Sequence, residues 1–520
     1  MLTAYTSDEI RAAEQVLMAR LPGGTLMRRA ATGLAVACVK ALPRVYGSRV
    51  VLLIGSGDNG GDALYAGAAL ARRGARVHAI LAGARTHEGG LAELRRVGGR
   101  TYDLRGISDP ARTEGAKAGT SASGPAKALE TDPMLVNLIG GADVIVDGLV
   151  GIGGTGALRE PYATLARMSA GSPGIVVAVD VPSGVDASTG EVEGEAVRAH
   201  LTVTFGAVKA GLLIDPGASH AGTLRQVDIG LGPFLPAPGV VTLTGPDVAE
   251  RMPRAEPESN KYRRGVVGVV AGSDRFTGAA VLAVGGAVRA GAGLVRFASA
   301  AEAVQQVRAK WPEAVTKIIT PEEGVREVGR VQAWVLGPGM GTDDDAHALA
   351  RSVLDSDVPV LVDADGLTLA TRDRSLLRRS APTLITPHAG ELGRLLGVPV
   401  EEIEERRLHH ARLAAAELGV TVLLKGSTTL VAEEGRPVRV NLTGTPWLAT
   451  GGTGDVLAGI AGAFLAGGLS CYEAASCAAF VHGLAARMAA GGPEGGQAPI
   501  AALDVALELP SAIRTLTASR

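Results

Sequence analysis

The stretch Ala449-Thr-Gly-Gly-Thr-Gly-Asp-Val-Leu-Ala-Gly459 is a glycine-rich turn that runs directly into an apolar segment. Gly451, Gly452 and Gly454 carry no Cβ, so the backbone can turn its N–H groups toward one point. If Asp455 opens the helix that the following apolar residues predict, unpaired amides and the positive end of a helix dipole meet beside it. Such an arrangement binds an anion, for example a phosphate group.

Asp455 would repel a phosphate held at this turn, so its presence needs a chemical reason. A general base that takes the proton from a hydroxyl group attacking that phosphate is such a reason. A structural turn is the alternative, because the chain contains 72 glycines and one glycine-rich motif is weak evidence. The other motifs of the chain decide between the two.

The composition predicts a large soluble α/β protein of two domains, because the 520 residues are 46% hydrophobic and 20% charged. A net charge of −2 without a long basic run indicates neither a nucleic-acid partner nor a membrane partner. The three cysteines lack metal-binding spacing, which is typical of a reducing compartment. Charged residues occupy the N-terminus where a signal peptide would be apolar, so we expect a cytoplasmic location.

Apolar runs that end near glycine or aspartate recur through the first 230 residues, as expected of buried parallel strands. They cover residues 49–55, 76–81, 144–147, 175–180 and 201–205. Two helices precede them, one after a cap at Ser7 and one over residues 26–40. This alternation predicts a doubly wound, three-layer α/β/α domain. Residues 82–133 break the pattern and are interpreted as a partly flexible surface insertion.

A second series of strand-like runs follows a Pro-rich section at residues 231–257, which is interpreted as a linker. The runs cover residues 266–271, 333–336, 359–363, 383–386 and 420–425, and two apolar helices follow the glycine turn. The sequence therefore predicts domains over residues 1–230 and 258–520, both of the three-layer α/β/α class.

Three loops that carry aspartate follow strands of the first domain, where open α/β sheets bind ligands. They are Gly55-Ser-Gly-Asp-Asn-Gly-Gly-Asp62, Asp147-Gly-Leu-Val-Gly-Ile-Gly-Gly-Thr-Gly156 and Asp180-Val-Pro-Ser-Gly-Val-Asp186. Glycine-rich loops suit a pyrophosphate, but the first is not GxGxxG, which disfavours a plain dehydrogenase. Each loop alone is explained by a tight turn, whereas their convergence favours a binding site.

These motifs, together with Thr202-Val-Thr-Phe-Gly-Ala-Val-Lys209, resemble the NAD(P)H-hydrate epimerase domain over most of residues 1–230. The resemblance implies a Rossmann-like fold, exchange of the R and S epimers of hydrated NADH or NADPH at C6, and a bound potassium ion. It implies Asp180 as the catalytic residue and Asn59, Asp147 and Ser183 as the potassium ligands. The implied dinucleotide contacts are Asp58, Asn59, Gly60, Gly61, Asp62, Gly151, Ile152, Gly153, Gly154, Thr155, Gly156, Ala157 and Asp180. Asp58 and Ala63 depart from the family, which usually has Asn and Gly at these positions.

Five loops of the second domain carry groups that suit phosphoryl chemistry at strand ends. They are Val270-Ala-Gly-Ser-Asp-Arg-Phe-Thr-Gly-Ala-Ala280, Leu336-Gly-Pro-Gly-Met-Gly341, Val362-Asp-Ala-Asp-Gly-Leu367, Thr386-Pro-His-Ala-Gly-Glu391 and Leu424-Lys-Gly-Ser-Thr-Thr429. Each has an ordinary structural explanation, such as a loop histidine or a capping lysine. Their order before the glycine turn predicts one shared cleft.

Across roughly residues 260–490 these motifs resemble the ribokinase-like dehydratases specific for the S form of NAD(P)H hydrate, and both domains together resemble the bifunctional NAD(P)H-hydrate repair enzymes. The resemblance implies a ribokinase-like C-terminal fold and dehydration at the expense of ADP, through a phosphorylated intermediate, with AMP and phosphate as products. Asp455 would be the base, and Mg²⁺ would accompany ADP. The implied hydrate contacts are Ala280, Gly341, His388 and Asp455, and the implied ADP contacts are Lys425, Gly426, Ser427, Thr428, Thr429, Gly451, Gly452, Thr453 and Gly454.

Two alternatives stay open at this point. A kinase of a small alcohol, such as a vitamin or sugar precursor, would use the same turn and Asp455, with the first domain as a non-catalytic nucleotide-binding module. The first domain could instead be a binding or scaffold module. The expected partners are small molecules, the two hydrates and ADP, and the sequence leaves homo-oligomerisation open.

Overall fold

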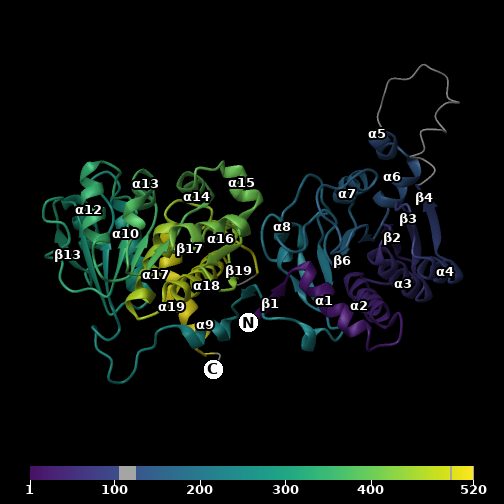
Figure 1. The fold of residues 1–520 in the computed structure, drawn as a ribbon, viewed down its shortest axis with the longest axis horizontal. Helices are drawn as coiled ribbons and strands as arrows, with labels where there is room; N and C mark the ends of the chain where they lie inside the picture. Colours follow the sequence, from purple (N-terminus) through teal and green to yellow (C-terminus); the bar gives the residue numbers. More distant parts are fainter. Residues whose placement is uncertain (105–124, 492–494, 519–520) are drawn as a thin grey trace, which may run out of the picture. The chain divides into compact units, whose positions relative to one another are not determined.

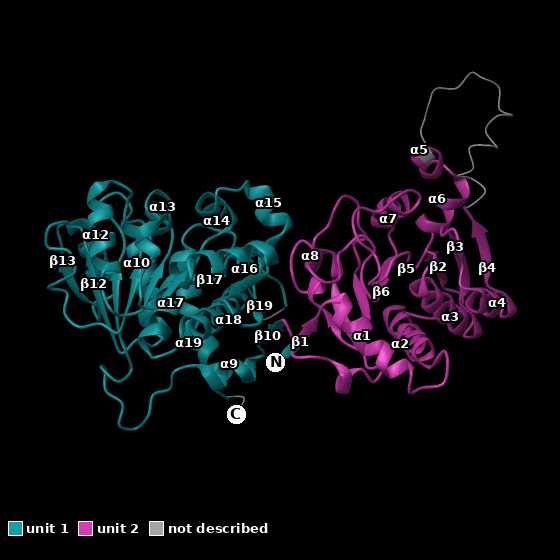
Figure 2. Cartoon of the chain, in the orientation of Figure 1, with its two compact units in different colours: residues 1–2, 240–520 teal, residues 3–239 magenta. Residues whose placement is uncertain are grey.

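A computed structural model describes residues 1–104, 125–491 and 495–518 of the chain (Figure 1). The chain divides into two compact units, an N-terminal unit of residues 3–239 and a C-terminal unit of residues 1–2 and 240–520 (Figure 2). Each unit is organised around a sheet, which is parallel in the N-terminal unit and mainly parallel in the C-terminal unit. Among the described residues, no helix combines the length and the apolar character needed to cross a membrane.

The N-terminal sheet is parallel throughout, in the order β4-β3-β2-β5-β6-β7-β9. Its strands are β2 (Arg49–Ile54), β3 (Arg76–Leu81), β4 (Arg100–Asp103), β5 (Val144–Gly148), β6 (Ile175–Val179), β7 (Leu201–Phe205) and β9 (Thr223–Val227). The strand order reverses between β2 and β5, which is the switch point of a dinucleotide-binding fold. This order confirms the predicted Rossmann-like class.

Helices cover both faces of this sheet, because alternate residues of each strand point to opposite sides. Val50, Leu52 and Ile54 face the core beneath α2 and α3, whereas Val51 and Leu53 face the core beneath α6 and α7. The helices are α1 (Ser7–Met18), α2 (Thr25–Ala41), α3 (Asp58–Arg72), α4 (Glu88–Arg96), α5 (Pro125–Glu130), α6 (Pro133–Gly140), α7 (Tyr162–Ala170) and α8 (Gly217–Ala221). A short strand, β8 (Val208–Lys209), pairs with β1 (Leu2–Tyr5). The cap of α1 is Thr6, in a capping box with Glu9, rather than the predicted Ser7.

The predicted insertion at residues 82–133 is wrong where the structure describes it. Helix α4 packs against α3, and β4 extends the sheet beside β3. Leu94 and Leu104 are buried in the two cores. Gly89 and Gly90 weaken the helical signal of α4, and the edge strand β4 is short and polar, so neither element has a clear pattern in the sequence. Residues 105–124 lie outside the described residues.

The C-terminal sheet follows the order β13-β12-β11-β14-β15-β16-β17-β18-β19-β10. The strands from β13 to β17 are parallel, and β18 is antiparallel to both of its neighbours. They are β10 (Val240–Thr242), β11 (Val266–Val270), β12 (Leu294–Ser299), β13 (Val315–Ile318), β14 (Ala333–Leu336), β15 (Val360–Val362), β16 (Thr383–Ile385), β17 (Thr421–Leu424), β18 (Thr429–Ala432) and β19 (Val438–Asn441). The five predicted runs correspond to β11, β14, β15, β16 and β17.

Small residues let the helices of this unit pack closely on one face of the sheet. A Cβ on Gly459 of α17 would lie 2.0 Å from the carbonyl oxygen of Ala283 in α10, and one on Gly286 would lie 2.3 Å from that of Val456. This contact holds α17 firmly beside α10. The helices are α9 (Gly245–Arg251), α10 (Thr277–Arg289), α11 (Ala301–Lys310), α12 (Asp344–Leu354), α13 (Asp365–Arg372), α14 (Ala389–Leu396), α15 (Val400–Glu405), α16 (Arg407–Leu418), α17 (Thr453–Ala466), α18 (Cys471–Ala490) and α19 (Ala502–Ala518).

The predicted linker at residues 231–257 is wrong for its second half, which is folded. Strand β10 pairs with β19, and α9 packs against α18 and α19. The Pro-rich composition suggested a linker, but Pro246 lies in the first turn of α9, where a helix does not need its missing N–H. The C-terminal unit therefore begins at Val240 rather than at residue 258.

Replacement of Leu94 by Ala tests whether residues 88–103 belong to the N-terminal core. Because Leu94 is fully buried, the variant should lose about 2–5 kcal/mol of unfolding free energy in that unit. Urea denaturation of the full chain measures the loss. The exposed neighbour Arg95 provides the control variant Arg95→Ala, and an equally small effect of both substitutions would place the segment outside the core.

Candidate active sites

A cavity of about 840 Å³ in the N-terminal unit lies at the carboxyl ends of β2, β5 and β6. This edge of the sheet, at the switch point, is where dinucleotide-binding folds hold their ligands. Helix α1 adds Arg11 and Glu14 to the wall, and His87 adds an imidazole. The predicted dinucleotide contacts that line the cavity are Asp58, Asn59, Asp62, Gly151, Ile152, Gly153, Gly154 and Asp180.

Gly60 and Gly61 do not line this cavity, although both were predicted contacts. A Cβ on Gly60 would lie 2.7 Å from the carbonyl oxygen of Gly55. One on Gly61 would lie 3.0 Å from the His87 ring and from Met27. The two glycines therefore bring the first turn of α3 close to β2 and to cavity-lining side chains.

Asp180 ends β6 with a backbone φ of 66°, a left-handed conformation that is rare for a residue other than glycine. Its Oδ1 accepts hydrogen bonds from the backbone N–H of Phe205 at 2.9 Å and from Thr204 Oγ1 at 3.3 Å. The ammonium group of Lys209 also donates to Oδ1. Lys209 is 1% exposed and was not a predicted site residue. Its partner lies 29 residues earlier in the chain, so no local motif indicates the pair.

Asp147 and Ser183, two of the predicted potassium ligands, contact each other. The Asp147 carboxylate accepts hydrogen bonds from Ser183 Oγ at 2.7 Å, from the Ser183 N–H at 2.8 Å and from the Leu149 N–H at 3.2 Å. Burial raises the pKa of Asp147 to about 6, and these hydrogen bonds oppose the rise. The third predicted ligand, Asn59, has a buried Nδ2 without a hydrogen-bond partner among the described residues.

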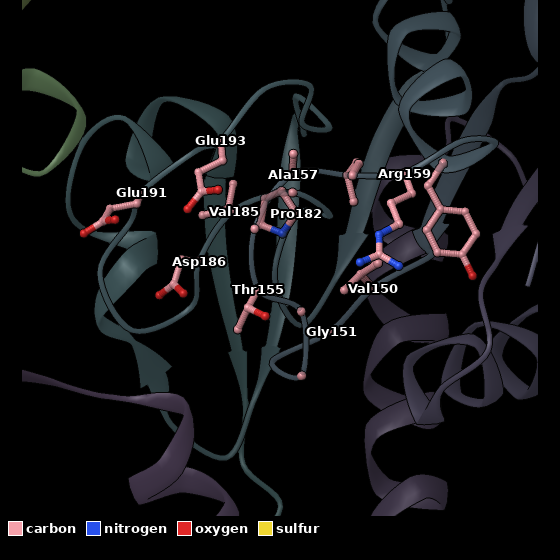
Figure 3. Close-up of a pocket in the computed structure, with 16 residues that line it drawn as sticks. Val150, Gly151, Thr155, Ala157, Arg159, Pro182, Val185, Asp186, Glu191 and Glu193 are labelled. Carbon is pink, nitrogen blue, oxygen red and sulfur yellow. The ribbon is translucent and has the colours of Figure 1, made fainter. Parts of the chain in front are cut away.

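A second cavity, of about 320 Å³, shares part of its wall with the first (Figure 3). Thr155, Gly156 and Ala157 line only this smaller cavity, so the predicted contacts at residues 151–157 are divided between the two. Figure 3 shows Arg159 on one side of it and the carboxylates of Asp186 and Glu191 on the other. The glycine-rich loop after β5 is thus a wall common to both cavities.

Carboxyl groups surround Asp180 in the larger cavity. Burial, followed by the charges of Asp180, Asp58 and Glu14, raises the pKa of Asp62 well above its usual range. Burial and then Asp180 raise the pKa of Glu14. Glu14 was not a predicted site residue, because α1 lies far along the chain from the glycine-rich motifs. The cavity therefore combines Asp180, held by a cation, with carboxyl groups that resist ionisation.

The glycine turn of the C-terminal unit leads into a helix, as the sequence predicts, but the helix begins at Thr453 rather than at Asp455. Gly452 is the N-cap of α17 with φ 88°, and Asp455 is the third residue of the helix. A Cβ on Gly452 would lie 3.8 Å from Asp455 Oδ2, so the carboxylate points back toward the turn. The Thr453 hydroxyl donates to the carbonyl oxygen of Leu448 at 2.9 Å. The unpaired amides at the start of α17 and this carboxylate therefore share one location.

An ion pair between the partly exposed Lys425 and the buried Asp363 lies beside the turn. Lys425 Nζ donates to Asp363 Oδ1 at 2.7 Å and lies 3.6 Å from Glu391 Oε2. A Cβ on Gly454 would lie 3.4 Å from Lys425 Nζ and 4.0 Å from Asp363 Oδ2, which places the pair against the turn. Burial acts to lower the pKa of Lys425, but Asp363, Glu391 and Asp455 outweigh it and raise that pKa.

Asp455 has the acid–base character of a general base near neutral pH. Burial, followed by the charge of Asp363, raises the pKa of Asp455 to about 7, while Lys425 acts in the opposite direction. General bases work best when their pKa lies near the working pH. Asp363 belongs to a motif noted in the sequence but was not a predicted site residue.

The other three predicted hydrate contacts are Gly341, Ala280 and His388, and the structure gives the surroundings of each. The Gly341 N–H donates to Asp365 Oδ2 at 2.9 Å, and Gly341 has φ 89°. Ala280 is fully buried in α10. His388 is the N-cap of α14, where Nδ1 accepts from the Gly390 N–H at 3.0 Å, and its side chain is 55% exposed. The imidazole therefore has a capping role in addition to any contact with a ligand.

The loop between β17 and β18, which contains the predicted ADP contacts 425–429, is held by Arg407. This guanidinium, 2% exposed, donates from one nitrogen to the carbonyl oxygens of Lys425 at 2.9 Å and Thr428 at 3.3 Å. A Cβ on Gly426 would lie 2.2 Å from that nitrogen, so a larger residue here would displace the guanidinium group. His482 supports the turn from α18 through the backbone of Thr453, and burial lowers the pKa of His482 to about 4.

Comparison with known proteins identifies the family of the chain. Residues 23–211 match the family model described as YjeF-related protein N-terminus, and residues 267–503 match that of NAD(P)H-hydrate dehydratase. The bifunctional NAD(P)H-hydrate repair enzyme Nnr of Mycobacterium leprae is 42% identical over 518 residues, which cover 98% of this chain and 99% of the relative. The chain belongs to the family of bifunctional NAD(P)H-hydrate repair enzymes.

The corresponding repair enzyme of Mycobacterium tuberculosis (strain ATCC 25618 / H37Rv) is 45% identical over 480 residues, 91% of each chain. A solved structure of the ADP/ATP-dependent NAD(P)H-hydrate dehydratase from Bacillus subtilis is 30% identical, with a TM-score of 0.49, and covers 53% of this chain and 98% of that chain. Membership in the repair-enzyme family confirms the prediction of a bifunctional enzyme and leaves the small-alcohol kinase as the weaker alternative.

In this repair-enzyme chain, Asp363→Asn should lower the pKa of Asp455 from about 7 toward its ordinary value. The substitution removes the negative charge that most opposes ionisation of Asp455, and Asn still offers an oxygen to Lys425. Carbon NMR of ¹³C-labelled carboxyl groups measures the midpoint of the Asp455 titration, and the loss of a signal in Asp455→Asn assigns that signal to Asp455. The exposed Asp357 gives the control Asp357→Asn, and an unchanged midpoint in Asp363→Asn would contradict the assigned cause.

Proposed function

We propose that the N-terminal unit interconverts the R and S epimers of NADH and NADPH hydrates at C6. The C-terminal unit then dehydrates the S hydrate at the expense of ADP and releases AMP and phosphate. The observation that carries the proposal is Asp455, a carboxylate with a pKa of about 7 at the amide-rich start of α17. Such a base beside a phosphate cradle suits a hydroxyl group that attacks phosphorus.

The chemistry of epimerisation fits the larger N-terminal cavity. C6 of the hydrate carries both the ring nitrogen and a hydroxyl group, so the nitrogen lone pair can expel the protonated hydroxyl as water. Water that returns to the other face of the planar iminium carbon inverts the configuration and must lose a proton. Asp180 lines the cavity and accepts that proton, and the carboxyl groups of Asp62 and Glu14 are nearby sources of one.

The proposed potassium site consists of Asp147, Ser183 and Asn59. Carboxylate, hydroxyl and amide oxygens are hard ligands that suit a hard cation. No cationic side chain is among the groups that act on the pKa of the fully buried Asp147. Rotation of the Asn59 amide would exchange its unpartnered Nδ2 for an oxygen ligand. A bound potassium ion would supply positive charge that fixes the loop after β5.

Phosphorylation explains the use of ADP in the C-terminal unit. Asp455 takes the proton from the C6 hydroxyl group, and that oxygen attacks the terminal phosphorus of ADP with release of AMP. Backbone amides of residues 451–454 stabilise charge on the transferred phosphoryl group. Phosphate is a better leaving group than hydroxide, so the ring nitrogen expels it, and loss of a proton from C5 completes the dihydronicotinamide.

Lys425 and its loop would hold the nucleotide, since Arg407 fixes the loop and the ammonium group lies against the glycine turn. Mg²⁺ would arrive with the ADP phosphates, because it prefers phosphate oxygens, water and one or two carboxylates. The described residues contain no cluster of three or more metal-ligating side chains that could hold it alone. Mg²⁺ would neutralise phosphate charge during transfer.

The two activities should separate by single substitutions. Asp455→Asn should slow S-hydrate dehydration by about 100-fold or more, because it removes the base, and should leave epimerisation unchanged. Asp180→Asn should slow epimerisation to a similar extent and leave S-hydrate dehydration unchanged. Chromatography of the epimers without ADP, and recovery of near-ultraviolet absorbance with ADP and Mg²⁺, measure the two reactions. In each variant, the activity that is retained shows that the chain is still folded.

Product analysis separates this proposal from the kinase. A dehydratase releases inorganic phosphate and regenerates the reduced cofactor, whereas a kinase leaves a stable phosphate ester. An Asp455→Asn variant as fast as the parent chain would refute the proposed base.

Potassium should stabilise the N-terminal unit. At a KCl concentration ten times the dissociation constant, binding to the folded state adds about 1.4 kcal/mol, which raises the melting temperature. The increase should be absent in LiCl of equal ionic strength and in Asp147→Asn. Asp8, which is exposed, gives the control Asp8→Asn, which should retain the response to KCl. An equal response to both salts would argue against the site.

A further inference from the structure

Lys209 is among the largest fully buried side chains of the described residues, and its ammonium group forms hydrogen bonds beside Asp180. Nζ donates to Asp180 Oδ1, to Thr204 Oγ1 at 3.1 Å and to the carbonyl oxygen of Phe205 at 2.9 Å. Since an ammonium group has three protons, these partners satisfy it fully.

Every hydrogen bond that Asp180 accepts ends on the same oxygen. Lys209, Thr204 and the Phe205 N–H all donate to Oδ1, and no described residue donates to Oδ2. Asp180 also lines the larger cavity. The carboxylate is therefore held on one side and left with its second oxygen for a ligand.

The chain brings Lys209 to this position through a tight turn after β7. Gly206 has φ 69°, and a Cβ there would lie 2.2 Å from Leu231 Cδ1. The turn sends the chain into β8, which pairs with β1 through Val208 and Lys209. Lys209 is not among the residues that line the cavity, so it does not reach the substrate itself.

Stability alone gives little reason for this pair. Removal of two charges from water is unfavourable, and apolar replacement of a buried ion pair is often neutral or stabilising. The left-handed backbone of Asp180 adds strain. Both costs fall on the one residue that the proposed epimerase reaction uses.

We propose that Lys209 is a positioning residue of the N-terminal site: it binds Oδ1 of Asp180 so that Oδ2 exchanges the proton with the substrate. The inference rests on the proposed epimerase function of this unit. In this role Lys209 has two effects. It fixes the direction of the Asp180 carboxylate, and it favours the ionised form of that carboxylate.

The test is Lys209→Met in the full chain, with R-hydrate epimerisation followed by chromatography in the absence of ADP. We expect kcat to fall about 100-fold with KM within twofold of the parent value, since Lys209 acts on the base and does not line the cavity. Lys40→Met, on the exposed face of α2, is the matched control and should retain the parent values.

The pH profile separates positioning from a purely structural role. Glu14 from α1 and Asp58 and Asp62 from α3 also act on this cluster, and Arg11 and His87 line the cavity. Loss of the Lys209 cation leaves the negative charges of the carboxyl groups in this cluster unopposed, so the acid limb of kcat must move to higher pH.

Lys209 also lowers the pKa of Glu14, so the profile is repeated in a Glu14→Gln background, where the shift should persist. An unchanged acid limb with parent kcat in folded Lys209→Met overturns the inference. Activity of the C-terminal unit and the melting temperature report on folding.

Thr204→Val keeps the inference testable if Lys209→Met does not fold. This nearly isosteric change removes the hydroxyl that links Lys209 to Asp180, and it should shift the acid limb in the same direction by a smaller amount. No shift in this variant also overturns the inference. If Asp180→Asn retains epimerisation, the proposed function itself fails, whereas an inactive Asp180→Asn beside an unaffected Lys209→Met rejects only the role of Lys209.

Discussion

Each unit contains a lysine that is paired with a buried aspartate at the carboxyl end of a parallel strand. Lys209 binds Asp180 after β6, and Lys425 binds Asp363 after β15. A buried ion pair of this kind is stable only when each proton and lone pair has a partner. The backbone carbonyl groups and hydroxyls around each lysine therefore have to be in place before the site can form.

The two ion pairs act differently on the proposed catalytic carboxylates. In the N-terminal unit the lysine binds the proposed catalytic Asp180 directly. In the C-terminal unit it binds a neighbour of Asp455. Burial, followed by the charges of Asp363, Asp365 and Glu391, raises the pKa of Asp455 to about 7. One arrangement favours an ionised carboxylate, and the other favours a carboxylate that gains and loses a proton near neutral pH. The difference matches the two proposed reactions, because only the second deprotonates a hydroxyl group for attack on phosphorus.

The sequence predicts the features that local pattern determines. Apolar runs that end in glycine or aspartate mark the central strands of both sheets, because a strand buried on both faces has to be continuously apolar. The glycine turn before α17 is equally clear, since its conformation depends on the residues within it. Short strands such as β4 and β10 are missed, because their pairing with a neighbouring strand stabilises them more than their own composition does. Lys209, Glu14 and Arg407 are missed for the same reason, since each acts on a motif far from it along the chain.

The backbone of Asp180 shows why the conformational preferences of single residues do not predict this site. A left-handed φ favours glycine, and a chain selected for stability alone would have glycine after β6. Glycine there would leave the buried Lys209 ammonium without its carboxylate, which costs more than the strain that it relieves. Neither Lys209 nor the conformation of Asp180 is favourable alone, and each is explained by the other. The pair as a whole is explained by the cavity that it faces, because the oxygen that Lys209 leaves free is the one available to a ligand.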